Sequence, residues 1–283
     1  MALTINTNLG SLIVQKNLDK ATQALNRSIE RMTTGYKINS AGDDAAGYAV
    51  ATKMDTQLSS ISVAQDNVAI GSSLLSTAEN NYDLITTHLQ RIRDLTEEAA
   101  NGTYGQDSID AIKAEVGARW DEIDRIAAST EFNGIKILDG SKTTGITLQI
   151  GIDSSANSRL TLAANLFGNS NGQTLTTVAK NTFTGYFTVG GANYGTALNN
   201  IDTALATVTT RQTEIGAMQN RLDSAADALE VQYSNVTSSL STIRDADVAA
   251  ESSEYIKAQI LQQASASLLS TANQTPSIAL NLI

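Results

Sequence analysis

The stretch from residue 61 to residue 92, ISVAQDNVAIGSSLLSTAENNYDLITTHLQRI, carries the pattern that decides the fold. Two stripes recur there every seven positions, three residues apart: Ile61, Val68, Leu75, Tyr82 and Leu89, and then Ala64, Gly71, Ala78, Ile85 and Ile92. Such stripes are typical of a helix that packs along other helices. Because no proline lies between residues 45 and 100, we predict one helix there, roughly 80 Å long at ~1.5 Å per residue.

The C-terminal half contains a second repeat of the same kind. Its main stripe keeps the seven-residue spacing over Ile201, Val208, Ile215, Leu222, Leu229, Val236 and Ile243, and Met218 and Ala225 add a second stripe. We therefore predict a second long helix over residues 197–243.

The two ends of the chain read as weaker amphipathic helices. Near the start, Leu18, Leu25 and Met32 are seven apart, and near the other end Ile256, Ile260, Ala264 and Leu268 share a face. Each helix alone would be marginal in water because it buries little apolar area. We expect the two end helices to be ordered only by pairing with each other or with neighbours.

The middle of the chain changes its periodicity. A shorter helix fits residues 108–128, whereas residues 146–152 and 160–162 alternate apolar and polar side chains around a turn at 153–157, which predicts a small β region. Residues 168–195 have no helical period and read as a short surface segment with one small hairpin. The fold class predicted is mainly α: a long antiparallel helical bundle with a small β-hairpin region and paired terminal helices.

Composition limits the possible partners. The formal net charge is -10, so a nucleic-acid partner is not expected, since such proteins need a basic surface. No apolar run of about 18 residues exists, so we expect no membrane insertion. The first residues lack the pattern of a cleaved secretory signal, which predicts either a cytoplasmic protein or export by another route. The absence of cysteine excludes disulfides and thiolate sites.

No group of residues predicts catalysis, a metal site or a cofactor. His88 is the only histidine and reads as a solvated or interfacial helix residue. Asp43 and Asp44 read as caps at a helix start, and the acidic residues at 245, 247 and 251 as the opening of the last helix. Trp120 reads as a core or interface residue. These residues alone describe a self-associating protein of long helices.

Several ordered motifs resemble those of bacterial flagellins, and the resemblance covers nearly the whole chain. They are INTNLGSLIVQKNL at 5–18, RMTTGYKINSAGDDAAGYAV at 31–50, LQRIRDLTEEAANGT at 89–103, TEFNGIKILDG at 130–140 and STIRDADVAAESSEYIKAQILQQ at 241–263. The resemblance implies a structural, non-enzymatic subunit of the extracellular flagellar filament. It also implies export through the flagellar type III apparatus, with an export chaperone, cap and hook-junction proteins as partners besides other copies of the chain.

The resemblance further implies a division of the chain. Residues 1–44 and 244–283 would form the inner tube of the filament, 45–167 and 196–243 the surrounding helical layer with its β region, and 168–195 the variable surface segment. The residues expected in the inner tube are Leu18, Leu25, Met32, Ile256, Ile260 and Leu268. A segment as short as 168–195 leaves no room for a separate outer domain.

Part of the second helix has an implied contact role. In flagellins this region meets the neighbouring subunit and is the surface bound by a host Toll-like receptor. By motif, the contact residues would be Gln90, Arg91, Leu95, Ile112, Glu115 and Arg119. Asp94 and residues 96–98 depart from the usual pattern, and their extra carboxylates can weaken receptor binding. A hook-junction protein, a surface-displayed binding module and, remotely, an enzyme remain as alternatives.

Overall fold

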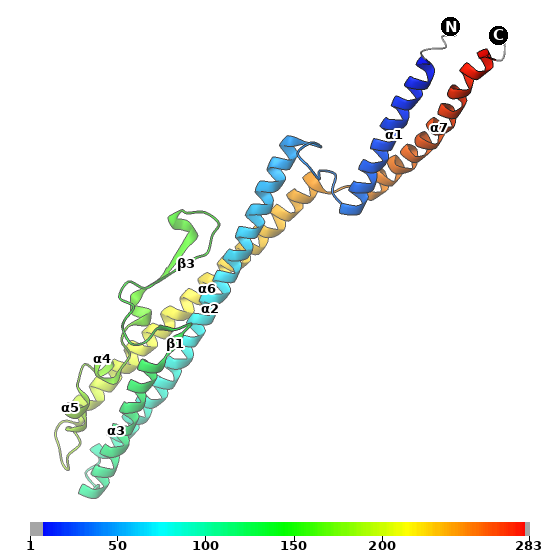
Figure 1. Ribbon diagram of the computed structural model, residues 1–283. Helices are drawn as coiled ribbons and strands as arrows, with labels where there is room; N and C mark the ends of the chain where they lie inside the picture. Colours follow the sequence, from blue (N-terminus) through cyan, green and yellow to red (C-terminus); the bar gives the residue numbers. More distant parts are fainter. Residues whose placement is uncertain (1–7, 281–283) are drawn as a thin grey trace. The chain divides into compact units, whose positions relative to one another are not determined.

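The computed structural model describes residues 8–280, with side chains through residue 274. Helices dominate, and two small hairpins lie between them (Figure 1). The chain forms two compact units. Unit 1 contains the residues up to Leu58 and those from Ser234 onward, and unit 2 is Ser59–Tyr233. The long helices α2 (Ala45–Ala100) and α6 (Tyr194–Arg244) each contribute to both units.

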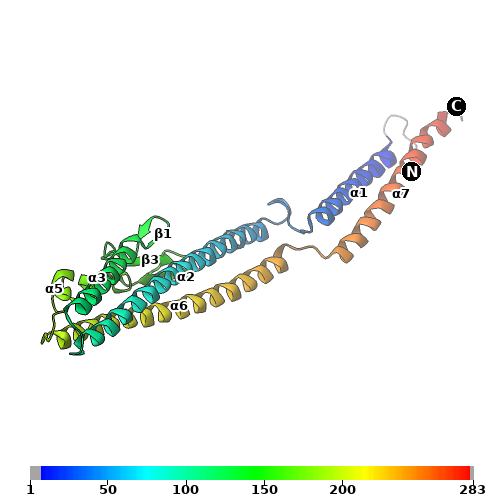
Figure 2. The ribbon, with the colours of Figure 1, turned by 90° about the horizontal axis from the view of Figure 1, so that it is seen from below.

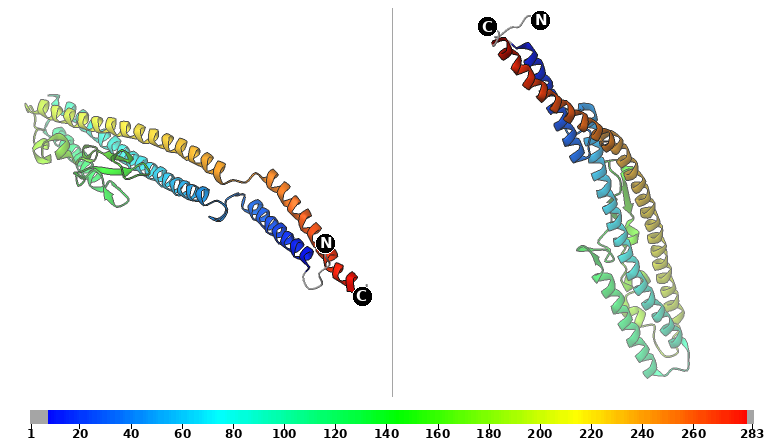
Figure 3. Two further views of the ribbon diagram at one scale, coloured as in Figure 1. Left: turned by 90° about the horizontal axis from the view of Figure 1, so that it is seen from above. Right: turned by 90° about the vertical axis from the view of Figure 1, so that its right-hand side faces the viewer.

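Unit 2 is built on the antiparallel pairing of α2 and α6, which lie side by side in two views (Figure 3). Cross-helix bonds join Asp83 to Gln212 at 2.6 Å and Arg93 to Asp202 at 2.8 Å. Both predicted stripes of α2 are buried in full, and so are the main-stripe residues of α6 from Ile201 to Leu229. The second-stripe residues Met218 and Ala225 are half-buried, as are Val236 and Ile243. The prediction of two long helices paired through heptad stripes is confirmed.

A third helix, α3 (Gln106–Ser129), lies along α2 and buries its apolar face. The buried side chains include Ile109, Val116 and Trp120, which confirms the predicted helix and places the tryptophan in the core. Two antiparallel hairpins follow. β1 (Glu131–Phe132) pairs with β2 (Ile135–Lys136), and β3 (Ile146–Gln149) pairs with β4 (Arg159–Leu162). The first strand of the second hairpin is shorter than the predicted alternation, since it ends at Gln149.

Gly71 explains how the second hairpin packs on α2. A Cβ at this position would lie 2.3 Å from Leu148 Cδ1, so a larger residue would require the Leu148 side chain on β3 to move. Glycine in a helix costs about 1 kcal/mol relative to alanine, and here it leaves room for that side chain.

The sequence predicts a small surface hairpin after β4, and this prediction is wrong. The segment contains two short helices, α4 (Gly172–Thr176) and α5 (Lys180–Thr184), and Phe183 and Phe187 are buried. The rings of Phe183 and Trp120 lie 5.0 Å apart. Aromatic packing against α3, rather than strand pairing, fixes this segment.

Unit 1 pairs the first helix with the last. α1 (Leu9–Thr34) and α7 (Val248–Leu280) lie side by side and run antiparallel (Figure 2). Thr22 accepts a bond from Gln262 at 3.1 Å, and Asn8 donates to the carbonyl of Ala272 at 2.8 Å. The expected pairing of the two end helices is therefore confirmed.

Candidate assembly surfaces

The contact between α1 and α7 is made of small residues. Its buried positions are Ala21 and Ser28 on α1, and Ala258 and Ser265 on α7. Leu18, Leu25 and Met32 lie half-buried along the same face of α1. Small side chains let two helices approach closely but remove little apolar area from water. The pair is therefore weakly stabilised by its own internal contact.

The outward faces of the same two helices carry large apolar side chains. On α7, Ile256 is 54%, Ile260 60% and Leu268 58% exposed. The predicted stripe of α7 therefore faces away from α1, because the true contact face is marked by alanine and serine. Leu9, Leu12 and Ile13 are exposed on α1 in the same way. Unit 1 thus presents apolar surface that the single chain leaves in water.

Two connectors join the end helices to the long helices, and their backbones pair. Lys37 N donates to Arg244 O at 2.7 Å, and Ala246 N donates to Gly35 O at 2.8 Å, around an antiparallel bridge between Tyr36 and Asp245. Gly35 has φ 75°, the left-handed conformation that ends α1 and turns the chain into this bridge. The two connectors are therefore joined to each other by backbone hydrogen bonds.

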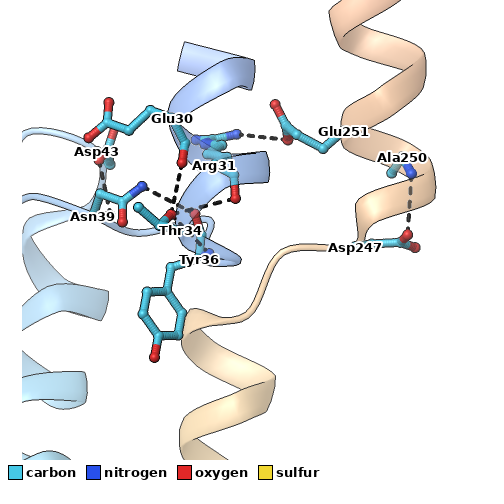
Figure 4. Close-up of polar contacts among 9 residues, drawn as sticks. All are labelled: Glu30, Arg31, Thr34, Tyr36, Asn39, Asp43, Asp247, Ala250 and Glu251. Carbon is cyan, nitrogen blue, oxygen red and sulfur yellow. Dashed lines mark hydrogen bonds and ion pairs between the residues drawn. The ribbon is translucent and has the colours of Figure 1, made fainter. Parts of the chain in front are cut away.

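Acidic side chains cap the helices that leave the connectors, as predicted. Asp44 Oδ1 accepts from the backbone N–H groups of Ala46 and Gly47 at the start of α2. Asp247 Oδ1 accepts from those of Ala249 and Ala250 at the start of α7, and Figure 4 draws the bond from Ala250. Both carboxylates satisfy N–H groups that have no partner inside their own helix.

Asp43 has a role other than the predicted helix cap, whereas Glu251 lies in the first turn of α7 as predicted. Asp43 bonds the backbone of Asn39 and Ser40 within the loop and does not cap a helix, and these hydrogen bonds lower its pKa. Glu251 faces Arg31 of α1 at 3.6 Å (Figure 4). Both contacts therefore stabilise the junction.

Arg244 contacts two other parts of the chain beside the connectors. Its guanidinium lies 4.1 Å from the centre of the Tyr36 ring and 2.8 Å from Asp55 Oδ2 on α2. A cation over an aromatic face adds about 0.5–1 kcal/mol at an exposed site. The last residue of α6 therefore joins the N-terminal connector to α2.

A second candidate surface lies where α2 meets α3. Arg91 donates two hydrogen bonds to the Glu115 carboxylate, of 2.9 and 3.2 Å. Arg119 forms an ion pair of 3.5 Å with the same carboxylate. The Arg91 side chain lowers the pKa of Glu115, and Glu115 raises the pKa of Arg91. Because both groups are exposed, the pair adds little stability and remains available to a partner.

Not all of the predicted contact residues lie on this surface. Gln90, Arg91, Glu115 and Arg119 are exposed or half-exposed, but Leu95 and Ile112 are only 2% and 7% exposed. A direct contact with a partner is therefore open to the four polar residues, while the two apolar ones hold α2 and α3 together beneath them. Thr96, one of the departures in the sequence, is also buried.

His88 lies half-buried on α2, near charges of α3. Burial and the Arg119 cation lower its pKa, and Glu122 opposes this shift. Its Nδ1 atom is buried without a hydrogen-bond partner among the described residues. No cluster of His, Cys, Asp or Glu suited to a metal occurs in residues 8–280, and no described helix is long and apolar enough to cross a membrane.

Comparison with known proteins decides the family. Residues 5–143 match the bacterial flagellin N-terminal helical region, and residues 198–283 match the bacterial flagellin C-terminal helical region. The chain belongs to the bacterial flagellin family. A flagellin of Listeria monocytogenes is 34% identical, with 99% of each chain covered, and polar flagellin F of Vibrio parahaemolyticus is 31% identical, with 100% of each covered.

A solved structure shows the same fold. A Vibrio parahaemolyticus protein, provisionally assigned as flagellar hook-associated, superposes with a TM-score of 0.61 at 18% identity, covering 72% of this flagellin chain and 100% of its own. At that identity the likeness concerns the fold alone. Since both flagellin regions match, the chain is a structural subunit of the flagellar filament, and the hook-junction alternative is not favoured.

Proposed function

We propose that the chain polymerises through the outward faces of α1 and α7, with a second copy of the chain as the partner. The observation that carries the proposal is the exposed apolar side chains on these two helices, above all Ile256, Ile260 and Leu268. A helix pair with a small-residue contact inside and large apolar residues outside is completed only when neighbours cover it.

The energy available from this burial is large enough to drive assembly. Full burial of one isoleucine or leucine side chain contributes about 1.5–3 kcal/mol. Several such residues per subunit can offset the entropy lost on association. Leu18, Leu25 and Met32 support this surface from beneath, because they order α1 against α7.

A double substitution tests this surface. Ile256→Ser with Ile260→Ser should raise the monomer concentration needed to elongate filament seeds at least about tenfold. The matched control is Val189→Ser, which removes an apolar side chain that is also about half exposed but lies in unit 2. Elongation is followed by light scattering and negative-stain microscopy. Unchanged elongation by the double variant would contradict the proposal.

The four exposed residues around Arg91 are proposed as a second contact between subunits. An arginine held by a carboxylate presents remaining donors in a fixed orientation, which suits a recurring interface. The same patch is the proposed site for a host Toll-like receptor. We further propose an export chaperone, a cap and hook-junction proteins as partners, with export by the type III apparatus. The proposal includes the functional division at residues 44, 167, 195 and 243, and membership of the family supports it.

Arg91→Ala tests the patch. We expect slower seed elongation or weaker receptor signalling with an unchanged far-UV helix signal. Arg125→Ala is the control, because Arg125 forms a similar exposed pair with Glu122 on α3 itself. Equal effects of both variants would show that removal of any exposed positive charge causes the defect. A loss of helix content would show that Arg91 is needed for folding.

A further inference from the structure

Arg211 occupies a position of α6 where the heptad pattern calls for an apolar residue. Positions 197, 204, 218 and 225 belong to the same stripe and hold alanine, alanine, methionine and alanine. Ala197 and Ala204 are fully buried. One charged side chain therefore interrupts an otherwise apolar stripe of α6.

The guanidinium of Arg211 is held by neutral oxygens. Its Nη1 donates to Ser170 Oγ at 2.8 Å and to Gly168 O at 3.1 Å, with longer bonds of 3.4 Å to Asn169 O and to the Tyr82 hydroxyl. Within residues 8–280, no carboxylate forms an ion pair with it. The residue is thus matched to one particular set of acceptors.

These acceptors come from two elements that are themselves joined. Tyr82, on α2, is fully buried and donates its hydroxyl hydrogen to Leu166 O at 2.8 Å. Ser170 lies 3.2 Å from the same hydroxyl and bonds Leu138 through its backbone. The polar cluster around Arg211 therefore connects α6, α2 and the segment before α4 at a single level of the bundle.

The apolar layers between α2 and α6 cannot define that level by themselves, and the cross-helix bonds of Asp83 and Arg93 are exposed and add little. Its layers repeat every seven residues, so sliding α6 by seven positions again places apolar residues against apolar residues. Arg211 would then face Leu75 or Leu89 instead of Tyr82, and neither leucine offers a hydrogen-bond acceptor in its side chain. Arg211 is half-buried, and a cation partly removed from water is unfavourable when it has no acceptors. One polar residue within an apolar stripe is a known way to specify register.

We propose that Arg211 fixes the register in which α6 pairs with α2. A slide of seven residues would move α6 along α2 by about 10 Å. It would separate Arg244 from Asp55 and pull the paired connectors out of line. The residue thereby gives every copy of the chain the same pairing of α6 with α2, as a helical polymer requires. The inference concerns the single chain and does not depend on the proposed assembly surfaces.

The chain contains no cysteine, so introduced cysteine pairs report register without background. Glu79 accepts a bond from Gln219 at 2.9 Å, which makes Glu79→Cys with Gln219→Cys the reporter of the observed register. Glu79→Cys combined with Gln212→Cys, or with Ala226→Cys, reports a slide of seven residues in either direction. Purified monomers of each double variant are treated with a short thiol-reactive cross-linker, and cross-linked species are measured by mass spectrometry.

With Arg211 in place, we expect cross-linking only between positions 79 and 219. With Arg211→Leu, the product of one or both displaced pairs should rise about tenfold while helix content is retained, because leucine fits every layer equally. Tyr82→Phe removes one acceptor and should give a smaller rise. Arg221→Leu, an exposed change on the same helix, is the control and should leave the original pattern unchanged.

Displaced products that do not rise in either Arg211→Leu or Tyr82→Phe would overturn the proposal. An equal rise with Arg221→Leu would do the same, because it would assign the effect to helix charge. If Arg211→Leu alone loses its helix signal, the Tyr82→Phe series still decides the question.

Discussion

Two antiparallel helix pairs in this chain differ in what they bury. The α2 and α6 pair of unit 2 encloses Ile61, Leu75, Tyr82 and their partners completely, whereas the α1 and α7 pair of unit 1 encloses mainly alanine and serine. Large apolar residues are present in both pairs, but in unit 1 many of them point outward. One pair thus carries its own core, and the other leaves large apolar side chains in water, which is the surface proposed for contact with neighbouring chains.

The difference predicts that substitutions in the two units affect two different properties. Alterations in unit 2 should appear in the stability of the monomer. Alterations in unit 1 should appear in assembly and leave the monomer nearly unchanged. The single tryptophan, Trp120, lies in the core of unit 2, so its fluorescence reports on that unit alone.

The largest effect should follow removal of the pair in unit 1. A chain that lacks the residues before Asn39 and after Arg244 should remain a soluble, helical monomer and should not elongate filament seeds. The physical reason is that the outward apolar faces are gone while the unit 2 core is intact. Sedimentation and electron microscopy provide the measurement. Filaments of the truncated chain would show that unit 2 is sufficient for polymerisation.

The next effect concerns the core of unit 2. Leu75→Ala should lower the free energy of unfolding by about 2–5 kcal/mol, because it opens a cavity in a fully buried layer. Urea titration followed by Trp120 fluorescence measures it. Leu12→Ala, an exposed change on α1, is the matched control and should leave the midpoint in place. Equal shifts would mean that the two units unfold as one.

A smaller effect is expected at the start of α7. Asp247→Ala removes a helix cap worth about 0.5–2 kcal/mol. Because α7 belongs to unit 1, the temperature at which filaments depolymerise should fall while the Trp120 unfolding midpoint stays constant. Asp227→Ala, on the exposed face of α6, should change neither quantity. A lower Trp120 midpoint with Asp247→Ala would extend the influence of the cap into unit 2.

The smallest effect concerns Asp124, on α3. Burial raises the pKa of this carboxyl, although the N–H of Gly172 donates to it at 2.7 Å and opposes the rise. Just above the ordinary aspartate pKa of about 3.9, the folded chain binds more protons at this site than the unfolded chain, so Asp124 lowers stability as pH rises.

Asp124→Asn should remove this contribution and keep the acceptor for Gly172. Unfolding free energies between about pH 4 and 6 should then fall less with rising pH, by below ~1 kcal/mol because the site is partly screened by water. The same substitution at the exposed Asp223 is the control. A steeper fall in the Asn variant would contradict the sign of the shift.

Much of this architecture is predictable from periodicity, and the predictions that were wrong have physical causes. The stripes through Ile61 and Ile201 mark buried layers, because large apolar residues dominate there. On α7 a search for large apolar residues selects Ile260 and misses Ala258, because close helix contact favours small side chains. In the segment 168–195, glycine, asparagine and threonine hide two short helices, and only the spacing of Phe183 and Phe187 could have suggested a buried cluster.

The candidate surfaces were predictable to a similar extent. Arg91 and Glu115, which the family motif selects, are exposed, but the motif selects the buried Leu95 as well, because it records position and not exposure. Arg211 was missed because it interrupts the stripe by which the helix was identified. A charged residue at a stripe position, with alanine seven residues away on one side and methionine on the other, is the signal that could have found it.

The bond from Asn8 to Ala272 joins residues 264 positions apart in the sequence. The entropic cost of closing a loop grows with its length, so this contact costs more to form from the unfolded chain than a local one. In kinetic terms, α1 and α7 form contacts of very high sequence separation, and such contacts slow folding. The first described helix of the chain is therefore expected to be among the last to reach its final structure, and native-state hydrogen exchange should show it opening long before the layers around Tyr82.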